Sequence, residues 1–235
     1  MAAAATSTAR PEPWRRRLYV PNYQVREAAR YAGVSSQTVL NWQKAGLKQT
    51  IASREMREAL SYMQLIEVAV VAKMRKAGVR PPEIRATREY VSKKLRSEYP
   101  FAEYRFKTDG KKLFMDYEQV EGKKGRGKLL RPGQNGQLAW EEVIGRLLEF
   151  EYEHKGIAIR WHVAGRGSSV LIDPRVAFGA PMVRGTPTWA IRGRWEAGET
   201  IDEIADDFGL TENEVRDALT FEGIDYSTPL SKWTH

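Results

Sequence analysis

Two pairs of short helices, each joined at a single glycine, constrain the fold of this chain most strongly. Apolar residues repeat at helical spacing on both sides of Gly33 and again on both sides of Gly209. A helix pair with a tight glycine turn is the basic unit of a helix-turn-helix. Residues 23–44 and 201–222 are therefore each predicted to form a helix-turn-helix-like segment.

Charge separates the two segments. Residues 1–128 hold 27 basic and 13 acidic side chains, whereas residues 129–235 hold 11 and 17. Residues 196–225 alone contain 11 acidic residues and one basic residue. Duplex DNA is a polyanion that gains most of its sequence-independent affinity from Lys and Arg, so only the first segment suits DNA. The alternative is that the charge separation only keeps a two-domain protein soluble.

The second helix of the basic segment presents hydrogen-bonding side chains on its outer face. Ser35 is placed to cap this helix, and Val39 and Trp42 face inward. Gln and Asn can pair bidentately with adenine, while hydroxyl and basic side chains hold phosphates. The candidate DNA-binding residues are Arg26, Ser36, Gln37, Thr38, Asn41 and Lys44. The alternative is an ordinary helical corner with a polar outer surface.

The middle of the chain alternates helical, strand-like and glycine-rich segments. Residues 51–76 predict a helix buried on most of its surface, and residues 82–96 predict a helix with a basic face. Asp109-Gly110 between alternating residues predicts a β-hairpin within 101–117. Residues 121–137 contain five glycines and predict a basic linker.

The acidic half predicts a helix over 140–152, a half-buried strand over 157–163, and short strands at 170–172 and 182–183. Capping boxes at Thr200 and Thr211 then open two helices. We therefore expect a mainly α fold with short β-hairpins, of the α+β class. The expected divisions are a disordered tail (1–13), a DNA-binding domain (14–98), a hairpin (99–120), the linker (121–137), a second helix-turn-helix-like domain (138–225) and a C-terminal tail (226–235).

Several classes of protein are disfavoured by what the chain lacks. It has no cysteine, and its three histidines, His154, His162 and His235, have no ligand-like spacing, so no metal site is expected. Residues 1–13 have no apolar core that could act as a secretory signal, and the longest apolar run is far shorter than a membrane helix. These features predict a cytoplasmic protein without membrane contact.

The basic segment resembles the N-terminal domain of MerR-like regulators, and the likeness extends over about 70 to 80 residues. The residues that carry it are Tyr23, Val25, Glu27, Ala28, Ala29, Gly33, Val34, Ser35, Thr38, Val39, Trp42, Gly46 and Leu47. The sequence departs from that family at Leu40, where the family has Arg. The resemblance implies a winged helix-turn-helix.

The acidic half is similar to a small antitoxin domain family of formerly unknown function (DUF433-like). The residues that carry the likeness are Ile172, Asp173, Pro174, Gly179, Pro181, Arg184, Gly185, Thr186, Gly198, Glu203, Ile204, Ala205, Thr211, Glu212, Val215, Ala218 and Leu219. Together the two halves resemble VapB-type antitoxins.

That combined resemblance implies a non-enzymatic antitoxin without a cofactor. Such a protein neutralises a PIN-domain (VapC-like) ribonuclease toxin and represses its own operon by binding operator double-stranded DNA as a homodimer. Trp and Arg are common interface anchors, and a basic side chain could neutralise an acidic nuclease site. The candidate toxin-binding residues are Trp189, Arg192, Arg194, Trp195, Lys232 and Trp233.

Two other functions remain open. The chain could be a stand-alone MerR-like transcription regulator whose acidic half senses a small ligand. It could also be a hydrolytic enzyme using Asp202, Asp206 and Asp207, of which the first two lie one helical turn apart. Without a basic or metal-binding neighbour in sequence, these three carboxylates are better explained as a solvated helix face.

Overall fold

Helices and small antiparallel strand pairs make up the computed structural model, so the predicted α+β class is confirmed. The structure describes residues 12–44, 46, 49–55, 57–108, 111–116, 118–125, 129–134, 137–139, 145–146, 149–153 and 156–226. The N-terminal helices are α1 (Pro13–Arg17), α2 (Val25–Ala32), α3 (Ser36–Gln43), α4 (Tyr62–Lys76), α5 (Pro81–Leu95) and α6 (Pro100–Glu103). No described helix is long and apolar enough to cross a membrane.

Helix α4 forms the centre of the N-terminal half, and Met63, Ile66 and Val70 have no exposed surface. The sequence predicted that this helix begins at residue 51, but it begins at Tyr62. Ser61 caps it, because its hydroxyl accepts a hydrogen bond from the backbone of Gln64 and the Gln64 side chain accepts one from the backbone of Ser61. Ile51, Ala52 and Leu60, which precede Ser61, are buried without being helical.

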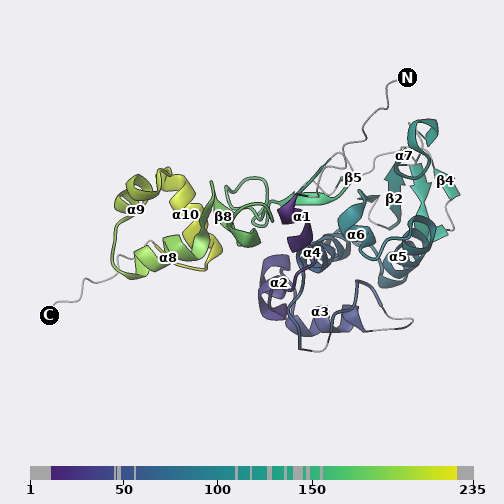
Figure 1. Ribbon diagram of the computed structural model, residues 1–235, viewed down its shortest axis with the longest axis horizontal. Coiled ribbons are helices and arrows are strands. Elements are labelled where there is room, and N and C mark those ends of the chain that lie inside the picture. The colour runs from purple at the N-terminus through teal and green to yellow at the C-terminus, as the bar shows by residue number, and fades with distance from the viewer. Residues whose placement is uncertain are drawn as a thin grey trace, which may run out of the picture.

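A five-stranded antiparallel sheet lies beside α5 at one end of the molecule (Figure 1). Its strands are β1 (Lys107–Thr108), β2 (Leu113–Asp116), β3 (Leu129–Arg131), β4 (Gln137–Ala139) and β5 (Gly145–Arg146), in the order β4-β3-β2-β1-β5. Thr108 lies opposite Leu113, as the predicted hairpin requires, although Asp109 and Gly110 lie outside the described residues. Phe101 belongs to α6 instead of a strand.

Part of the predicted linker belongs to this sheet. Residues 118–125 form α7 (Glu118–Glu121) and the short helix η1 (Gly122–Gly125), and β3 then pairs with β2. Leu130 lies opposite Met115 and is 2% exposed. The turn η2 (Pro132–Gln134) packs on α5. Burial of Leu130 therefore keeps this glycine-rich stretch in the fold, which its composition did not predict.

The prediction of a helix over residues 140–152 is wrong for those residues in this range that the structure describes. Gly145–Arg146 is strand β5, and Phe150–Tyr152 is strand β6. β6 pairs with β7 (Ala158–Trp161), where a strand was predicted, and the rings of Phe150 and Trp161 stack with centroids 5.9 Å apart. Pairing across the chain therefore overrides the helical spacing of the apolar residues. Residues 140–144 and 147–148 lie outside the described residues.

The C-terminal part is a chain of short strand pairs followed by three helices. Isolated bridges join Trp161 to Ile172 and Leu171 to Met182, the first residue of β8 (Met182–Val183), which pairs with β9 (Thr186–Pro187). The helices are α8 (Thr188–Glu196), α9 (Ile201–Phe208) and α10 (Glu212–Phe221), at the end of the molecule opposite the sheet (Figure 1). Both predicted capping boxes are present, and Gly209 takes the predicted left-handed turn with φ of 63°.

Candidate functional site

The turn between α2 and α3 has the geometry that the sequence predicts. Gly33 ends α2 in the left-handed conformation, with φ of 67°. The Ser35 hydroxyl then accepts a hydrogen bond from the backbone of Thr38 over 3.1 Å and caps α3. Ala28, Ala29 and Val39 are buried between the helices. The inner face of α3 is therefore fixed on α2, and its outer face is free for another partner.

Four of the six candidate DNA-binding residues are exposed on these two helices, namely Arg26, Gln37, Asn41 and Lys44. Gln37 and Asn41 lie one helical turn apart, and the Gln37 amide donates to Asn41 Oδ1 over 3.2 Å. Ser36 and Thr38 are half-buried, and the Thr38 hydroxyl is 2.8 Å from that of Ser35. Thr38 thus supports the cap, and the outward surface is centred on the Gln37–Asn41 pair.

The segment after α3 differs from a winged helix. Within the described part of residues 44–61, one isolated bridge pairs Leu60 with Tyr23, and no two-stranded wing is formed. The buried carboxylate of Glu67 instead accepts hydrogen bonds from the backbones of Ala52 and Phe101, over 2.6 and 3.3 Å. This segment is thereby tied to α4 and α6.

The candidate toxin-binding residues have different environments. Trp189 is 65% exposed on α8, whereas Trp195 is 8% exposed and belongs to the core. Arg192 pairs with Glu196 over 2.8 Å, and Arg194 pairs with both Glu199 and Asp207. The hydrogen bonds that Arg194 donates to Glu199 and Asp207 raise the pKa of Arg194 above its usual value. Lys232 and Trp233 lie outside the described residues.

The three aspartates of α9 are not part of a group that could hold a metal ion among the described residues. Asp207 is paired with Arg194, and Asp202 lies in the first helical turn, where the Thr200 hydroxyl lowers its pKa. Among the described residues there is no group of three or more His, Asp or Glu side chains placed to hold a metal ion.

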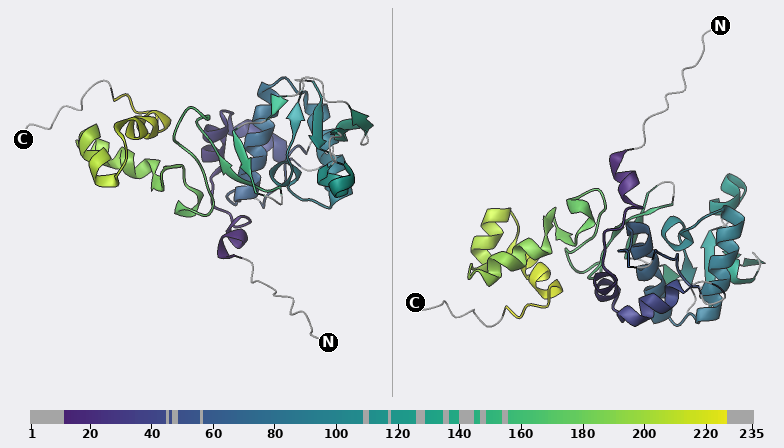
Figure 2. Two further views of the ribbon diagram at one scale, coloured as in Figure 1. Left: turned by 90° about the horizontal axis from the view of Figure 1, so that it is seen from above. Right: turned by 60° about the horizontal axis from the view of Figure 1, so that its bottom comes forward.

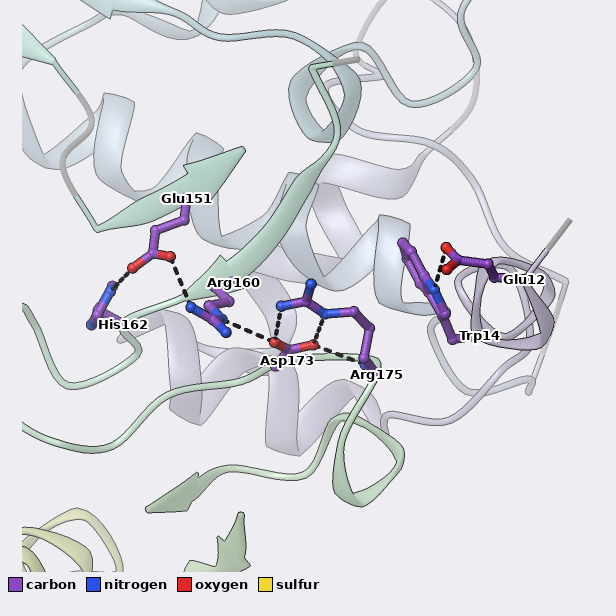
Figure 3. Close-up of polar contacts among 7 residues, drawn as sticks. All are labelled: Glu12, Trp14, Glu151, Arg160, His162, Asp173 and Arg175. Atoms are coloured by element: carbon purple, nitrogen blue, oxygen red, sulfur yellow. Dashed lines mark hydrogen bonds and ion pairs between the residues drawn. The ribbon is translucent and has the colours of Figure 1, made fainter. Parts of the chain in front are cut away.

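An ionic network around the buried carboxylate of Asp173, which no local sequence pattern predicts, fixes the segment leading to α8 (Figure 3). Asp173 is 2% exposed and accepts hydrogen bonds from Arg160 Nε at 3.0 Å and Arg175 Nε at 2.8 Å. Burial disfavours its charged form, but the bonds from Arg175 and Arg160 outweigh that effect and lower the pKa of Asp173. Glu151 extends the network from Arg160 to His162, whose Nε2 is 2.6 Å from Glu151 Oε1.

The same segment docks against the residues that lead into α2. The Tyr23 hydroxyl donates to the carbonyl of Gly179 over 2.9 Å, and the Asn22 amide donates to that of Phe178 over 2.9 Å. A Cβ atom on Gly179 would lie 2.1 Å from the Tyr23 hydroxyl, so only glycine fits this approach. Aside from the Asp-Pro and Gly-x-Pro motifs around it, the sequence holds no signal for this long-range contact.

A second contact joins α2 to the end of α10. Arg30 donates to the carbonyl of Phe221 over 3.3 Å and lies 3.4 Å from Glu222 Oε2. The rings of Tyr31 and Phe221 are 5.7 Å apart. The acidic helices are thus attached to the side of α2, and α3 lies along another edge of the molecule (Figures 1 and 2). The two helix pairs therefore present separate surfaces.

Three comparisons relate this chain to known proteins. Residues 170–221 match the family model described as a protein of unknown function, DUF433. The chain is 25% identical over 227 residues to a Mycobacterium tuberculosis protein named "Putative antitoxin VapB45", covering 86% of this chain and 94% of that protein. The crystal structure of Rv2018 from Mycobacterium tuberculosis has the same fold, with a TM-score of 0.62 and 22% identity over 86% of this chain and 99% of that one.

Proposed function

We propose that this protein is the antitoxin of a type II toxin–antitoxin pair. In this proposal it binds a PIN-domain ribonuclease toxin directly and represses its own operon by binding operator DNA as a dimer. The relative named as an antitoxin supports this assignment, because the similarity extends over 94% of that protein. The observation that carries the DNA half is the exposed Gln37–Asn41 pair on the outer face of α3.

The DNA half follows from the chemistry of α3. Gln and Asn side chains each match the N6 and N7 groups of adenine in the major groove, and a good bidentate pair contributes about 1–3 kcal/mol of discrimination. The present bond between Gln37 and Asn41 holds both amides on one face. Lys44 at the end of α3 and Arg26 on α2 are exposed beside them and are suited to phosphate contacts. A dimer would place two such helices on a two-fold symmetric operator.

The toxin half uses the C-terminal helices in this proposal. Trp189 is an exposed aromatic anchor on α8, and Arg192 is the exposed cation one turn further along. Nuclease sites of the PIN type are acidic, so a donated guanidinium would neutralise one. Arg194 is held by two carboxylates and is a weaker candidate, and Trp195 would act only by supporting α8 from the core.

DNA binding is tested by titrating the promoter fragment of the chain's own operon at several salt concentrations. We expect the affinity to fall steeply with salt and the Gln37→Ala, Asn41→Ala double variant to lose discrimination against a scrambled fragment. Trp189→Ala is the matched control, because it removes an exposed side chain far from α3. Affinity that is independent of salt, or equal for the double variant, would exclude the DNA assignment.

Toxin binding is tested by co-expression with the protein encoded by the adjacent gene. We expect the two chains to co-purify and the growth arrest caused by that protein alone to be relieved. The proposal fails for the toxin if neither effect is found with a soluble, folded chain.

A further inference from the structure

An exposed aromatic side chain borders a small cavity where the helix-turn-helix meets the C-terminal part. Phe178, in the short helix η3 (Ala177–Gly179), is 73% exposed, more than any other large hydrophobic side chain among the described residues. Val20, which follows α1, is 52% exposed and lies on the same cavity. These two residues are 158 positions apart in the sequence, so the fold itself has brought them together.

The backbone holds Phe178 in this outward position. Ala177 and Phe178 both have left-handed backbone angles, with φ of 47° and 52°. Such angles are unfavourable for residues other than glycine, at roughly 1 kcal/mol or more for each residue. The bonds from Asn22 to the Phe178 carbonyl and from Tyr23 to the Gly179 carbonyl keep the loop in place. The exposed ring is therefore displayed by a loop that is anchored on both of its last two residues.

The cavity has room for one side chain. Its volume is about 80 Å³, and it is lined by Arg17, Val20, Asn22, Tyr23, Tyr62, Pro174 and Phe178. Pockets that hold whole small ligands are larger, roughly 300–1,000 Å³. A mainly apolar pocket of single-residue size is typical of the central hot spot of a protein–protein interface.

Charge around the cavity indicates what the partner carries. The Arg17 guanidinium lies 5.3 Å from the centre of the Phe178 ring, and Arg16 is exposed on α1. Neither arginine has an ion pair with any described residue. Arg192 and Arg194, in contrast, are already paired within α8 and with α9. Arg16 and Arg17 are therefore better placed than the arginines of α8 to pair with carboxylates of another protein, whereas Arg15 is already paired with Glu153.

We propose that this junction pocket, formed by Arg17, Val20, Pro174 and Phe178, accepts one apolar side chain of the toxin. The toxin segment that supplies it carries carboxylates that face Arg16 and Arg17. The identity of the partner rests on the proposed antitoxin function, whereas the pocket and its charge come from the geometry. Aliphatic walls at Val20 and Pro174 favour an apolar side chain of a protein over the polar edges of a nucleic acid base.

The test measures the affinity of the full chain for the purified toxin by calorimetric titration. One variant combines Phe178→Asn with Val20→Ser. Asn tolerates left-handed backbone angles, so the loop should keep its conformation. A second variant, Arg17→Glu, reverses the charge, and its matched control is Lys94→Glu, the same change on the exposed surface of α5. Melting temperature and operator affinity are measured for each variant.

We expect the double variant to bind the toxin on the order of 30-fold more weakly, as for a hot-spot side chain. Arg17→Glu should also weaken toxin binding, whereas Lys94→Glu should bind the toxin as wild type does. Melting temperature and operator affinity should be unchanged in all of these variants. If the double variant and Arg17→Glu both bind the toxin within threefold of wild type, the pocket proposal is overturned and the proposed antitoxin function is not affected. Loss of operator affinity alone also overturns it, because the patch would then serve DNA. Failure of the wild-type chain to bind the toxin instead removes the proposed function on which the partner rests.

Discussion

We expect the buried carboxylate of Glu67 to make the stability of the N-terminal half depend on pH. Glu67 lies on the central helix α4 with no exposed surface. Burial raises its pKa from 4.5 to about 7, although its bond from the backbone of Ala52 and the nearby charge of Arg88 act in the opposite direction. The buried site therefore favours the protonated, neutral form of the Glu67 carboxyl group.

The sign and size of the effect follow from proton linkage. Because the folded-state pKa lies above the unfolded value, Glu67 favours folding fully below pH 4.5, and this contribution is lost as the pH rises to 7 and above. The difference between the two pKa values corresponds to roughly 3 kcal/mol. Most of this, about 2–3 kcal/mol, should be lost between pH 5 and pH 8.

The perturbation is Glu67→Gln, which keeps the shape of the neutral side chain and cannot ionise. Urea unfolding of both proteins at pH 5 and pH 8 gives four free energies of unfolding. We expect the free energy of unfolding of the wild type to fall by about 2–3 kcal/mol more than that of the variant over this range. Other titrating groups cancel in this comparison. An equal change in both proteins, or a greater loss in the variant, would refute the reasoning.

Three further predictions concern the helix face, the junction and the caps. Replacing both Gln37 and Asn41 by Ala should weaken operator binding by about 10- to 100-fold while leaving non-specific binding nearly unchanged, which a gel-shift titration with two fragments measures. Gly179→Ala should lower the free energy of unfolding by at least about 2 kcal/mol, because the new Cβ meets the Tyr23 hydroxyl, and unfolding equal to wild type would contradict the junction geometry. Thr211→Ala should cost about 1 kcal/mol through loss of the α10 cap, as measured by urea unfolding, and no loss would mean that the cap does not stabilise the helix.

Local signals in the sequence were sufficient for the helix boundaries at both glycine turns. Ser35, Thr200 and Thr211 cap the helices they were expected to cap, and Gly33 and Gly209 take left-handed turns. Each of these features depends on residues within one or two helical turns. The neighbouring residues in the sequence are therefore enough to predict these caps and turns.

Features that depend on distant residues were not predictable in this way. Phe150 has a helical pattern of neighbours but forms a strand because β7 is available to pair with it. Leu130 lies in a glycine-rich stretch and is buried because β2 needs a neighbour. Trp195 was a candidate for toxin contact and is core, since composition does not tell which face of α8 points inward.

The candidate sites show the same division. Gln37 and Asn41 could be placed on an outer helix face from their spacing, and the structure exposes both. The contact between Tyr23 and Gly179 and the cavity beside Phe178 arise from segments more than 150 residues apart. Sequence periodicity carries no signal for contacts between such distant segments, so it does not predict this part of the surface.

We propose that one chain holds operator DNA and a toxin at the same time through separate surfaces. The most direct measurement adds the purified chain–toxin complex to labelled operator DNA and determines the mass of the bound species by light scattering. We predict a ternary complex that contains the chain, the toxin and the DNA. When Gln37 and Asn41 are replaced by Ala, the chain should still bind the toxin but no longer bind the operator. Release of the toxin on DNA binding, or a bound species without toxin, would contradict the claim.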